Sequence, residues 1–236
     1  TLVSIKGKGI VVNEPSVVAI RVTGDERNTI LAVGSEAKLM VGRTPASIQA
    51  IYPMKDGVIA DYRIAEEMIK AFIKKANKSV FLTSRVLICT PYGATEVDKK
   101  AIRDSAIAAG ARKVLLVDEP LAAAIGANLA VDLPQGTMIV DIGGGTTEIG
   151  VLSLGSIASA SSYNVGGYKM DEEIKDYVSR TFNIKIGDST AEKIKKEIGC
   201  VYGDSKKEMV IRGFDAHMGS PKEVVITSKH VKESLE

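Results

Sequence analysis

The stretch "MIVDIGGGTTEIGVLSLG", residues 138–155, places three consecutive glycines directly after a hydrophobic run that contains Asp141. The residues that follow, "TTEIGVLSLG", are rich in β-branched side chains and alternate in polarity, which is typical of a strand. The glycines are therefore predicted to form the bend of a β-hairpin. A dinucleotide-binding motif or a P-loop would instead place its glycines before a helix, and no Lys-Ser or Lys-Thr follows them here.

Such a hairpin offers groups that suit a phosphate. The backbone N–H groups of Gly144, Gly145 and Thr146 would form a nest of donors with a hydroxyl beside it. The carboxylate of Asp141 would repel a phosphate unless a cation lay between them, so we expect Mg²⁺ there, held through water. The alternative is a tight hairpin in which the glycines only supply positive φ angles. Two glycines would be enough for that, so the triplet with Asp141 and two threonines favours phosphate.

The composition excludes several classes of function. The chain has 236 residues, of which 45% are hydrophobic and 25% charged, the profile of a globular protein with one large core or two modest ones. Its net charge of +2, with no basic run and few aromatic residues, argues against nucleic acid as a partner. Two distant cysteines and two histidines argue against a zinc site and for a reducing cytosol. The sequence shows neither a membrane span nor a secretory signal.

Strand and helix patterns alternate along the chain, which predicts an α/β fold with parallel strand pairing. The helix over residues 94–111 is the best marked, because Thr95 can cap it, Asp98 lies three residues on, and Gly110 ends it. Residues 34–62 are expected to be irregular, and "VDLPQG", residues 131–136, to be a domain joint. Strands are expected at residues 2–5, 10–12, 16–21, 29–33, 85–91, 113–120, 137–145 and from 207 onward. The other helices are expected at residues 63–75, 120–130, 169–181 and 190–198.

The segment "DIGGGTTE" resembles the second phosphate motif of the actin, heat-shock chaperone and sugar-kinase superfamily. Together with "GKGIVVNEPSVVAI", "VGRTP", "PMKDGVIADY", "EPLAAAIGA" and "TAEKIKKEIG", it makes nearly the whole chain resemble the MreB family of bacterial actins. The resemblance implies an actin-like (ribonuclease H-like) ATPase fold with two related domains around a nucleotide cleft. They would be residues 1–133, with a small subdomain at about 22–50 that carries filament contacts, and residues 134–236.

The resemblance also implies segments outside this sequence. The family's first phosphate loop is expected just before residue 1, and its adenosine-binding glycine turn after residue 236. The chain is therefore expected to be the middle of a longer protein, truncated at both ends, and to bind nucleotide weakly by itself.

Site residues follow from the same resemblance. Asp141 matches the family's Mg²⁺-linked aspartate, and the β- and γ-phosphates of ATP or ADP would lie at Gly143, Gly144, Gly145, Thr146 and Thr147. Glu119, which precedes a proline at a helix start, matches the residue that positions the attacking water, and its neighbour Asp118 is the competing candidate. The alternative for Glu119 is a carboxylate that the helix dipole merely favours.

A second group of candidates lies further along the chain. Glu192 would accept hydrogen bonds from the ribose, and Lys195 would lie along the adenine; they are three residues apart and so share a helix face. An ordinary solvated pair predicts the same spacing. Gly166 and Gly167 match a second glycine turn near the phosphates, although Tyr168 stands where the family commonly has an acidic or small polar residue.

The implied function is ATP-dependent polymerisation, with slow hydrolysis, into filaments that determine cell shape or serve motility. Phe81 and Leu82 follow the basic "KKANK" and match the family's hydrophobic membrane loop, although they could simply cover a strand. The implied partners are further copies of the chain, the anionic inner face of the cell membrane, and membrane proteins of the shape machinery, which places the protein in the cytoplasm. A chaperone or sugar-kinase type ATPase, or a scaffold that does not hydrolyse ATP, are the alternatives.

Overall fold

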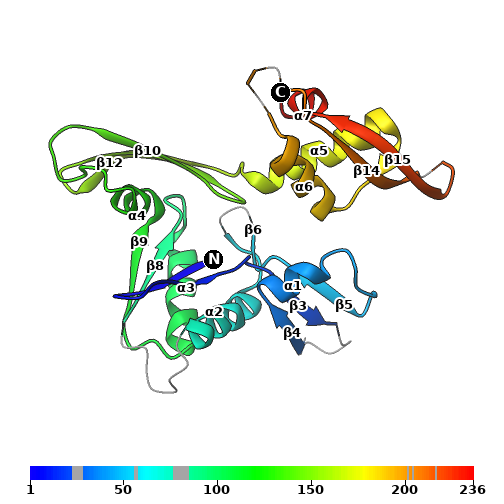
Figure 1. Cartoon of the computed structure of the whole chain (residues 1–236). Helices are drawn as coiled ribbons and strands as arrows, with labels where there is room; N and C mark the ends of the chain where they lie inside the picture. The colour runs from blue at the N-terminus through cyan, green and yellow to red at the C-terminus, as the bar shows by residue number, and fades with distance from the viewer. Residues whose placement is uncertain (23–28, 56–57, 77–84, 201, 204, 216) are drawn as a thin grey trace. The chain divides into compact units, whose positions relative to one another are not determined.

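The computed structural model describes residues 1–22, 29–55, 58–76, 85–200, 202–203, 205–215 and 217–236 (Figure 1). These residues form two compact units, Thr1–Asn164 and Val165–Glu236. The joint expected at residues 131–136 lies within the first unit. Compact packing and shared ancestry are different criteria, so the two related domains 1–133 and 134–236 stay a prediction.

The first unit alternates small sheets with helices. Its strands are β1 (Leu2–Ile5), β2 (Gly9–Asn13), β3 (Val18–Arg21), β4 (Thr29–Val33), β5 (Ile48–Ile51), β6 (Met54–Lys55), β7 (Val58–Ile59), β8 (Val86–Thr90), β9 (Val114–Asp118), β10 (Thr137–Ile142), β11 (Thr147–Ser153) and β12 (Ser156–Tyr163). Its helices are α1 (Ser35–Met40), α2 (Tyr62–Ala76), α3 (Glu96–Ala108) and α4 (Glu119–Gly126).

The prediction of an irregular region over residues 34–62 is wrong. Helix α1 and strand β5 lie within it, and β5 pairs with β3 antiparallel, so that β3 is the central strand of β4-β3-β5. Six residues are too few for helical periodicity to stand out, which is why α1 escapes detection. It begins after Gly34 at φ 78°, and the carboxylate of Glu14 accepts a hydrogen bond from the Ser35 N–H at 3.1 Å.

Helix α2 covers the strands at the start of the chain with one apolar face. Ile64, Met68 and Phe72, four residues apart and buried, pack with Val12, Val18 and Ile20. A second contact, between Ala65 and Ile102, joins α2 to α3. Helix α3 begins with the predicted cap, since Thr95 and Asp98 form a reciprocal capping box. The predicted end at Gly110, with φ 101°, is also confirmed.

Strands β8 and β9 pair in parallel through α3, as the strand-helix-strand pattern predicts, with Thr90 opposite Asp118. Strands β10, β11 and β12 form an antiparallel meander in that order. Helix α4 starts where β9 ends and packs against β10 and β11. The carboxyl end of β9 and the hairpin between β10 and β11 thus flank the start of α4.

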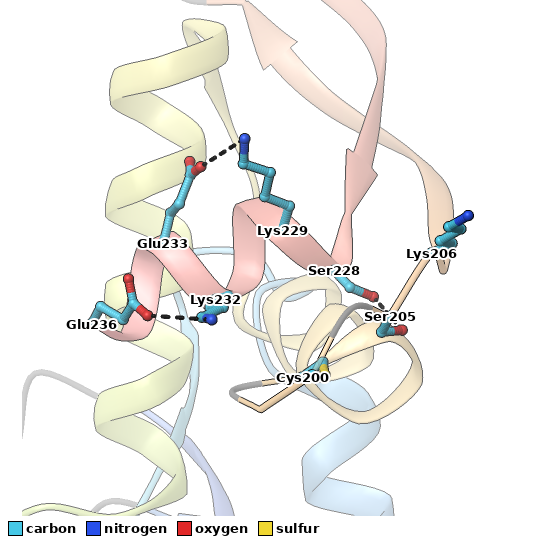
Figure 2. Close-up of a pocket in the computed structure, with 9 residues that line it drawn as sticks. Cys200, Ser205, Lys206, Ser228, Lys229, Lys232, Glu233 and Glu236 are labelled. Carbon is cyan, nitrogen blue, oxygen red and sulfur yellow. Dashed lines mark hydrogen bonds and ion pairs between the residues drawn. The ribbon is translucent and has the colours of Figure 1, made fainter.

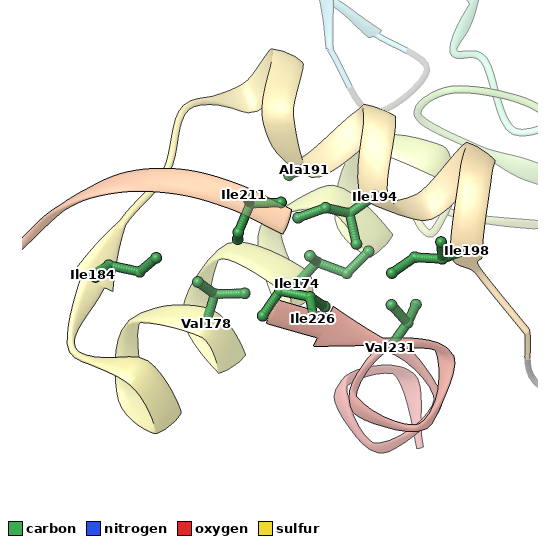
Figure 3. Close-up of a cluster of buried hydrophobic side chains, with 9 residues drawn as sticks. All are labelled: Ile174, Val178, Ile184, Ala191, Ile194, Ile198, Ile211, Ile226 and Val231. Carbon is green, nitrogen blue, oxygen red and sulfur yellow. The ribbon is translucent and has the colours of Figure 1, made fainter. Parts of the chain in front are cut away.

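The second unit packs three helices against a three-stranded antiparallel sheet. Its elements are α5 (Gly167–Phe182), β13 (Ile184–Lys185), α6 (Asp188–Ile198), β14 (Glu208–Asp215), β15 (Ser220–Thr227) and α7 (Ser228–Leu235). Figure 3 shows the buried side chains that converge from these elements, namely Ile174, Val178, Ile184, Ala191, Ile194, Ile198, Ile211, Ile226 and Val231. Helix α7 was not predicted, although Thr227 and His230 form a capping box at its start.

No helix in the part of the chain that the structure describes is long and apolar enough to cross a membrane.

Candidate functional site

The glycine triplet forms the bend between β10 and β11, and the predicted hairpin is confirmed. Ile142 pairs with Thr147 and Asp141 with Glu148, so the bend consists of residues 143–146. The N–H of Gly143 donates to the carbonyl of Thr146 at 2.8 Å and closes the bend. Asp141 is therefore the second-last residue of β10, and only Ile142 separates it from the bend.

Positive φ is not the reason for the triplet. Eight described glycines have positive φ angles, and none of Gly143, Gly144 and Gly145 is among them. At Gly143 an added Cβ would lie 3.2 Å from the carbonyl oxygen of Thr146, which is tighter than an ordinary contact. The structure thus removes the main support for the alternative of a merely tight turn. A triplet without side chains leaves the backbone N–H groups approachable, as an oxyanion ligand requires.

Helix α4 brings Glu119 to this hairpin. Glu119 is the first residue of α4, and Pro120 lies so close to β11 that a Cβ on Gly150 would be 2.7 Å from the Cβ of Pro120. Gly150 is two residues from Glu148 and therefore on the same face of β11. The start of α4 thus sits over the face of the sheet that also carries Asp141 and Glu148, which are paired across the two strands.

Glu119 is held in an environment that disfavours its charge. Burial, and then the nearby charges of Glu148 and Asp141, together raise its pKa from 4.5 to about 7. A helix N-terminus alone would lower the pKa of a carboxyl group. Burial and the like charges thus oppose the helix dipole at Glu119, and a carboxyl group with a pKa near neutrality suits proton transfer or the orientation of water. Asp118 precedes the helix and makes no side-chain capping bond.

The described residues provide no ion-pair partner for this acidic group. Among the ion pairs between described residues, none involves Glu119, Asp141 or Glu148. The part of the chain that the structure describes also contains no group of three or more His, Cys, Asp or Glu side chains placed to hold a metal directly. A cation at Asp141 would therefore have to complete its coordination with water or ligand oxygens, as Mg²⁺ commonly does. The pKa of the Cys89 thiol on β8 is raised by burial, and then by the charges of Glu119 and Asp141.

Glu148 is a residue of this region that the sequence analysis missed. Its side chain is 1% exposed, and its carboxylate accepts hydrogen bonds from the Tyr92 N–H at 3.0 Å and from the Ser162 hydroxyl at 2.5 Å. The sequence contains no local signal for it, because the apolar Ile149 and Val151 alternate with Glu148; only the structure shows that Glu148, Gly150 and Leu152 are the buried residues of β11. A charged residue on such a face is unusual and marks a special role.

The second unit brings the other candidates together around the start of α5. Gly166 caps α5 and Gly167 is its first residue. The ammonium of Lys195 on α6 lies 2.6 Å from the Gly167 carbonyl and 2.8 Å from the carboxylate of Asp171. This ammonium is thus bound to two groups of α5.

Glu192 and Tyr168 also lie around the start of α5. The carboxylate of Glu192 pairs with Lys196 at 2.6 Å. Burial, and then the charges of Glu192 and Asp171, raise the pKa of the Tyr168 hydroxyl. The structure therefore gathers Gly167, Glu192 and Lys195 within the second unit, and Asp141, Glu119 and the glycine hairpin within the first. Phe81 and Leu82 fall outside the described residues.

A cavity of about 420 Å³ in the second unit does not coincide with any of these candidates. Figure 2 shows its lysines and serines along α7 and in the segment after α6. Lys229 pairs with Glu233 and Lys232 with Glu236, each at 3.8 Å, and Ser228 donates to Ser205 at 3.0 Å.

Comparison with known proteins gives a consistent result. A family model described as "MreB/Mbl protein" matches residues 1–236. The cell shape-determining protein MreB of Haemophilus influenzae is 52% identical over 244 residues, which cover 100% of this chain and 69% of the relative. The crystal structure of MreB5 of Spiroplasma citri bound to ADP superposes with a TM-score of 0.92 at 36% identity, over 99% of this chain and 70% of that one. The same protein bound to AMPPNP gives 0.91 at 37% identity, with the same coverage. The predicted actin-like fold is thereby confirmed.

Proposed function

The chain belongs to the MreB/Mbl family, and we propose that it is the nucleotide-dependent part of a cell-shape filament protein. In this proposal it binds ATP with Mg²⁺, polymerises in the ATP state, and hydrolyses ATP slowly. The observation that carries the proposal is the position of Glu119 at the start of α4, packed over the strand face that carries Asp141, near a hairpin bend that contains three glycines. The ADP and AMPPNP bound to its structural neighbour support the choice of ligand.

The hairpin would hold the phosphates. Backbone N–H groups of residues 144–146 would donate to the β- and γ-phosphate oxygens, and Thr146 and Thr147 could add hydroxyl donors. Three acidic side chains nearby, for which the described residues provide no ion pair, make an anionic ligand unfavourable by itself. The residues therefore fit a Mg²⁺–nucleotide complex, in which the cation would lie on the side of Asp141 and neutralise phosphate charge.

Glu119 would orient the attacking water. Hydrolysis of a γ-phosphate depends chiefly on positioning and charge neutralisation, and a carboxylate can hold a water in line by accepting one of its hydrogen bonds. A pKa of about 7 lets the group also accept a proton near neutral pH. The same residue at an ordinary pKa would be a weaker base.

The second unit would hold the nucleoside. Glu192 would accept hydrogen bonds from the ribose, and the stem of Lys195 would pack along the adenine. The Gly166–Gly167 turn at the start of α5 would approach the phosphates, because it presents helix N–H groups. The ion pair between Lys195 and Asp171 would keep this turn in place.

In this proposal, the protein assembles into filaments at the cell membrane. Further copies of the chain would form the filament, and the filament would lie in the cytoplasm against the anionic inner face of the cell membrane. Phe81 and Leu82 would enter the headgroup layer, next to lysines that favour anionic lipid. Membrane proteins of the shape machinery would then meet the filament there.

The test is sedimentation with electron microscopy of the intact protein in Mg²⁺-ATP and in Mg²⁺-ADP. We expect filaments to be favoured by ATP. The Glu119→Gln variant should still bind ATP and polymerise, but release phosphate at least about 100-fold more slowly, since loss of an acid–base group typically costs that much. Asp118→Asn, one residue away, is the matched control and should hydrolyse normally. Normal hydrolysis by Glu119→Gln would remove Glu119 from the proposal, and tight ATP binding without filaments would favour a non-filament ATPase of the same fold.

The membrane part has a separate test. Replacing Phe81 and Leu82 together by serine should reduce co-sedimentation with vesicles that contain anionic lipid, because the apolar contact is lost while the lysines remain. Unchanged co-sedimentation would mean that these two side chains only cover a strand.

A further inference from the structure

Burying the carboxylate of Glu148 costs more free energy than burying an apolar side chain at the same position would. It lies on the inward face of β11 between the hairpin and Gly150, where Leu152 shows that an apolar side chain can fill the same face. A buried carboxylate is tolerated only when donors satisfy it, and here the donors are one backbone N–H and one hydroxyl, both neutral. An apolar residue would avoid this cost, so the carboxylate has to be explained by what it holds.

The two donors come from two different segments. Tyr92 lies in the turn between β8 and α3, where the Ala94 N–H also donates to the Pro91 carbonyl at 3.0 Å. Ser162 lies near the end of β12. A Cβ on Gly93 would lie 3.2 Å from the Cβ of Ser162, so the turn and β12 are in close contact. Glu148 therefore joins three segments that meet beside the hairpin.

From this geometry we propose that Glu148 is a positioning residue for ATP hydrolysis, which clamps the β8–α3 turn and β12 onto β11 and thereby fixes Thr146 and Thr147 relative to Glu119. The proposal rests on the proposed function. Thr147 directly precedes Glu148 in β11, and Thr146, at 9% exposure, is already packed against the protein. A shift of the clamped end of β11 would move both threonines away from a bound phosphate. Such a displacement slows chemistry more than it weakens nucleotide binding.

The experiment compares three variants of the intact protein by their affinity for Mg²⁺-ADP and by kcat for ATP hydrolysis. Glu148→Leu removes both hydrogen bonds while it fills the space. We expect kcat to fall about 100-fold, the effect of misplacing a reacting group by about an ångström, with ADP affinity within about threefold. Glu148→Gln can still accept from Tyr92 and donate to Ser162, so it should retain most of the activity that the leucine variant loses. Glu208→Gln, the same change at an exposed position of β14, is the matched control.

Two results would overturn the inference. Equal losses of kcat and ADP affinity in Glu148→Leu would mean that the residue only supports the fold. Losses in Glu148→Gln as large as in Glu148→Leu would mean that its charge, and not the clamp, is what matters. If the leucine variant does not fold, Ser162→Ala tests the same point, because it removes one arm of the clamp and should lower kcat about 10-fold with ADP affinity retained. A wild-type protein that neither binds nor hydrolyses ATP would overturn the proposed function itself, and this inference with it.

Discussion

The two units differ in whether a cation pairs with their buried and half-buried carboxyl groups. In the first unit, Glu119, Asp141 and Glu148 gather at the glycine hairpin, and no ion pair among the described residues neutralises them. In the second, Asp171 is 7% exposed, and the ammonium of Lys195 lies 2.8 Å from its carboxylate. Burial raises the pKa of both Glu119 and Asp171, and only Asp171 has a cation that opposes the shift.

This difference indicates what each region needs. A group of like charges without a partner is stabilised when a cation arrives, so the first region is suited to a metal-bound anionic ligand. An internally paired carboxylate keeps its geometry without a ligand, so the second region is suited to present a preformed surface to a nucleoside. We therefore expect the first region to respond strongly to Mg²⁺ and the second to be insensitive to it.

Breaking the first region should have the largest effect. Asp141→Ala is expected to weaken the affinity for ATP in Mg²⁺ by about 100-fold, the upper range for loss of a group that holds a metal indirectly. Titration of a fluorescent ATP analogue with and without EDTA measures this. Without Mg²⁺ the variant should bind as well as the wild type or better, because a repelling charge has been removed. Equal weakening in both conditions would show that Asp141 does not act through a cation.

The second region is tested by its ion pair. Lys195→Met leaves Asp171 mostly buried without its cation, so the free energy of unfolding should fall by about 2 kcal/mol, between the values for exposed and fully buried pairs. Asp171→Asn and the double variant complete a double-mutant cycle by urea denaturation. The double variant should recover part of the loss, and Mg²⁺ should change none of the four stabilities. Additive losses would mean that the two side chains do not act as a pair.

The smallest effect is the pH dependence of the nucleotide-free protein. In the folded state Glu119 has a pKa of about 7, above its ordinary value of 4.5. Between these two values the folded chain retains a proton that the unfolded chain releases, so stability should fall as the pH rises through this window. Melting curves between about pH 4.5 and 8 measure the slope, and Glu119→Gln should make it shallower. An unchanged slope would mean that Glu119 does not titrate there.

The sequence could predict features that depend on contacts between residues close together in the chain, and not those that depend on contacts between distant segments. The hairpin at residues 143–146 and the capping box at Thr95 are local, and both were correct in type and position. Glu119 and Asp141 could be named because the motifs that carry them are local as well. Their mutual proximity depends on α4 packing on Gly150, a contact between segments 30 residues apart that no local pattern encodes.

Glu148 and Asp171 escaped for a similar reason. The partners of Glu148, Tyr92 and Ser162, are 56 and 14 residues away in sequence, and a glutamate in a strand resembles any solvent-facing residue until the buried face is known. In the sequence Asp171 is one of several charged residues of a helix, and only the structure shows Lys195 beside it. Helix α1 was missed because it is short, and α7 because its eight residues follow a strand directly.

The two cysteines of the sequence fall one in each unit, Cys89 on β8 and Cys200 just after α6, and both are free thiols. The natural sequence thus already carries a pair of attachment points for a donor and an acceptor dye. The raised pKa of Cys89 makes its thiolate scarce at neutral pH, so its reaction with maleimides can be slowed or accelerated by the choice of buffer. Energy transfer between the two dyes would then report whether the distance between the units changes when ATP is added, one molecule at a time.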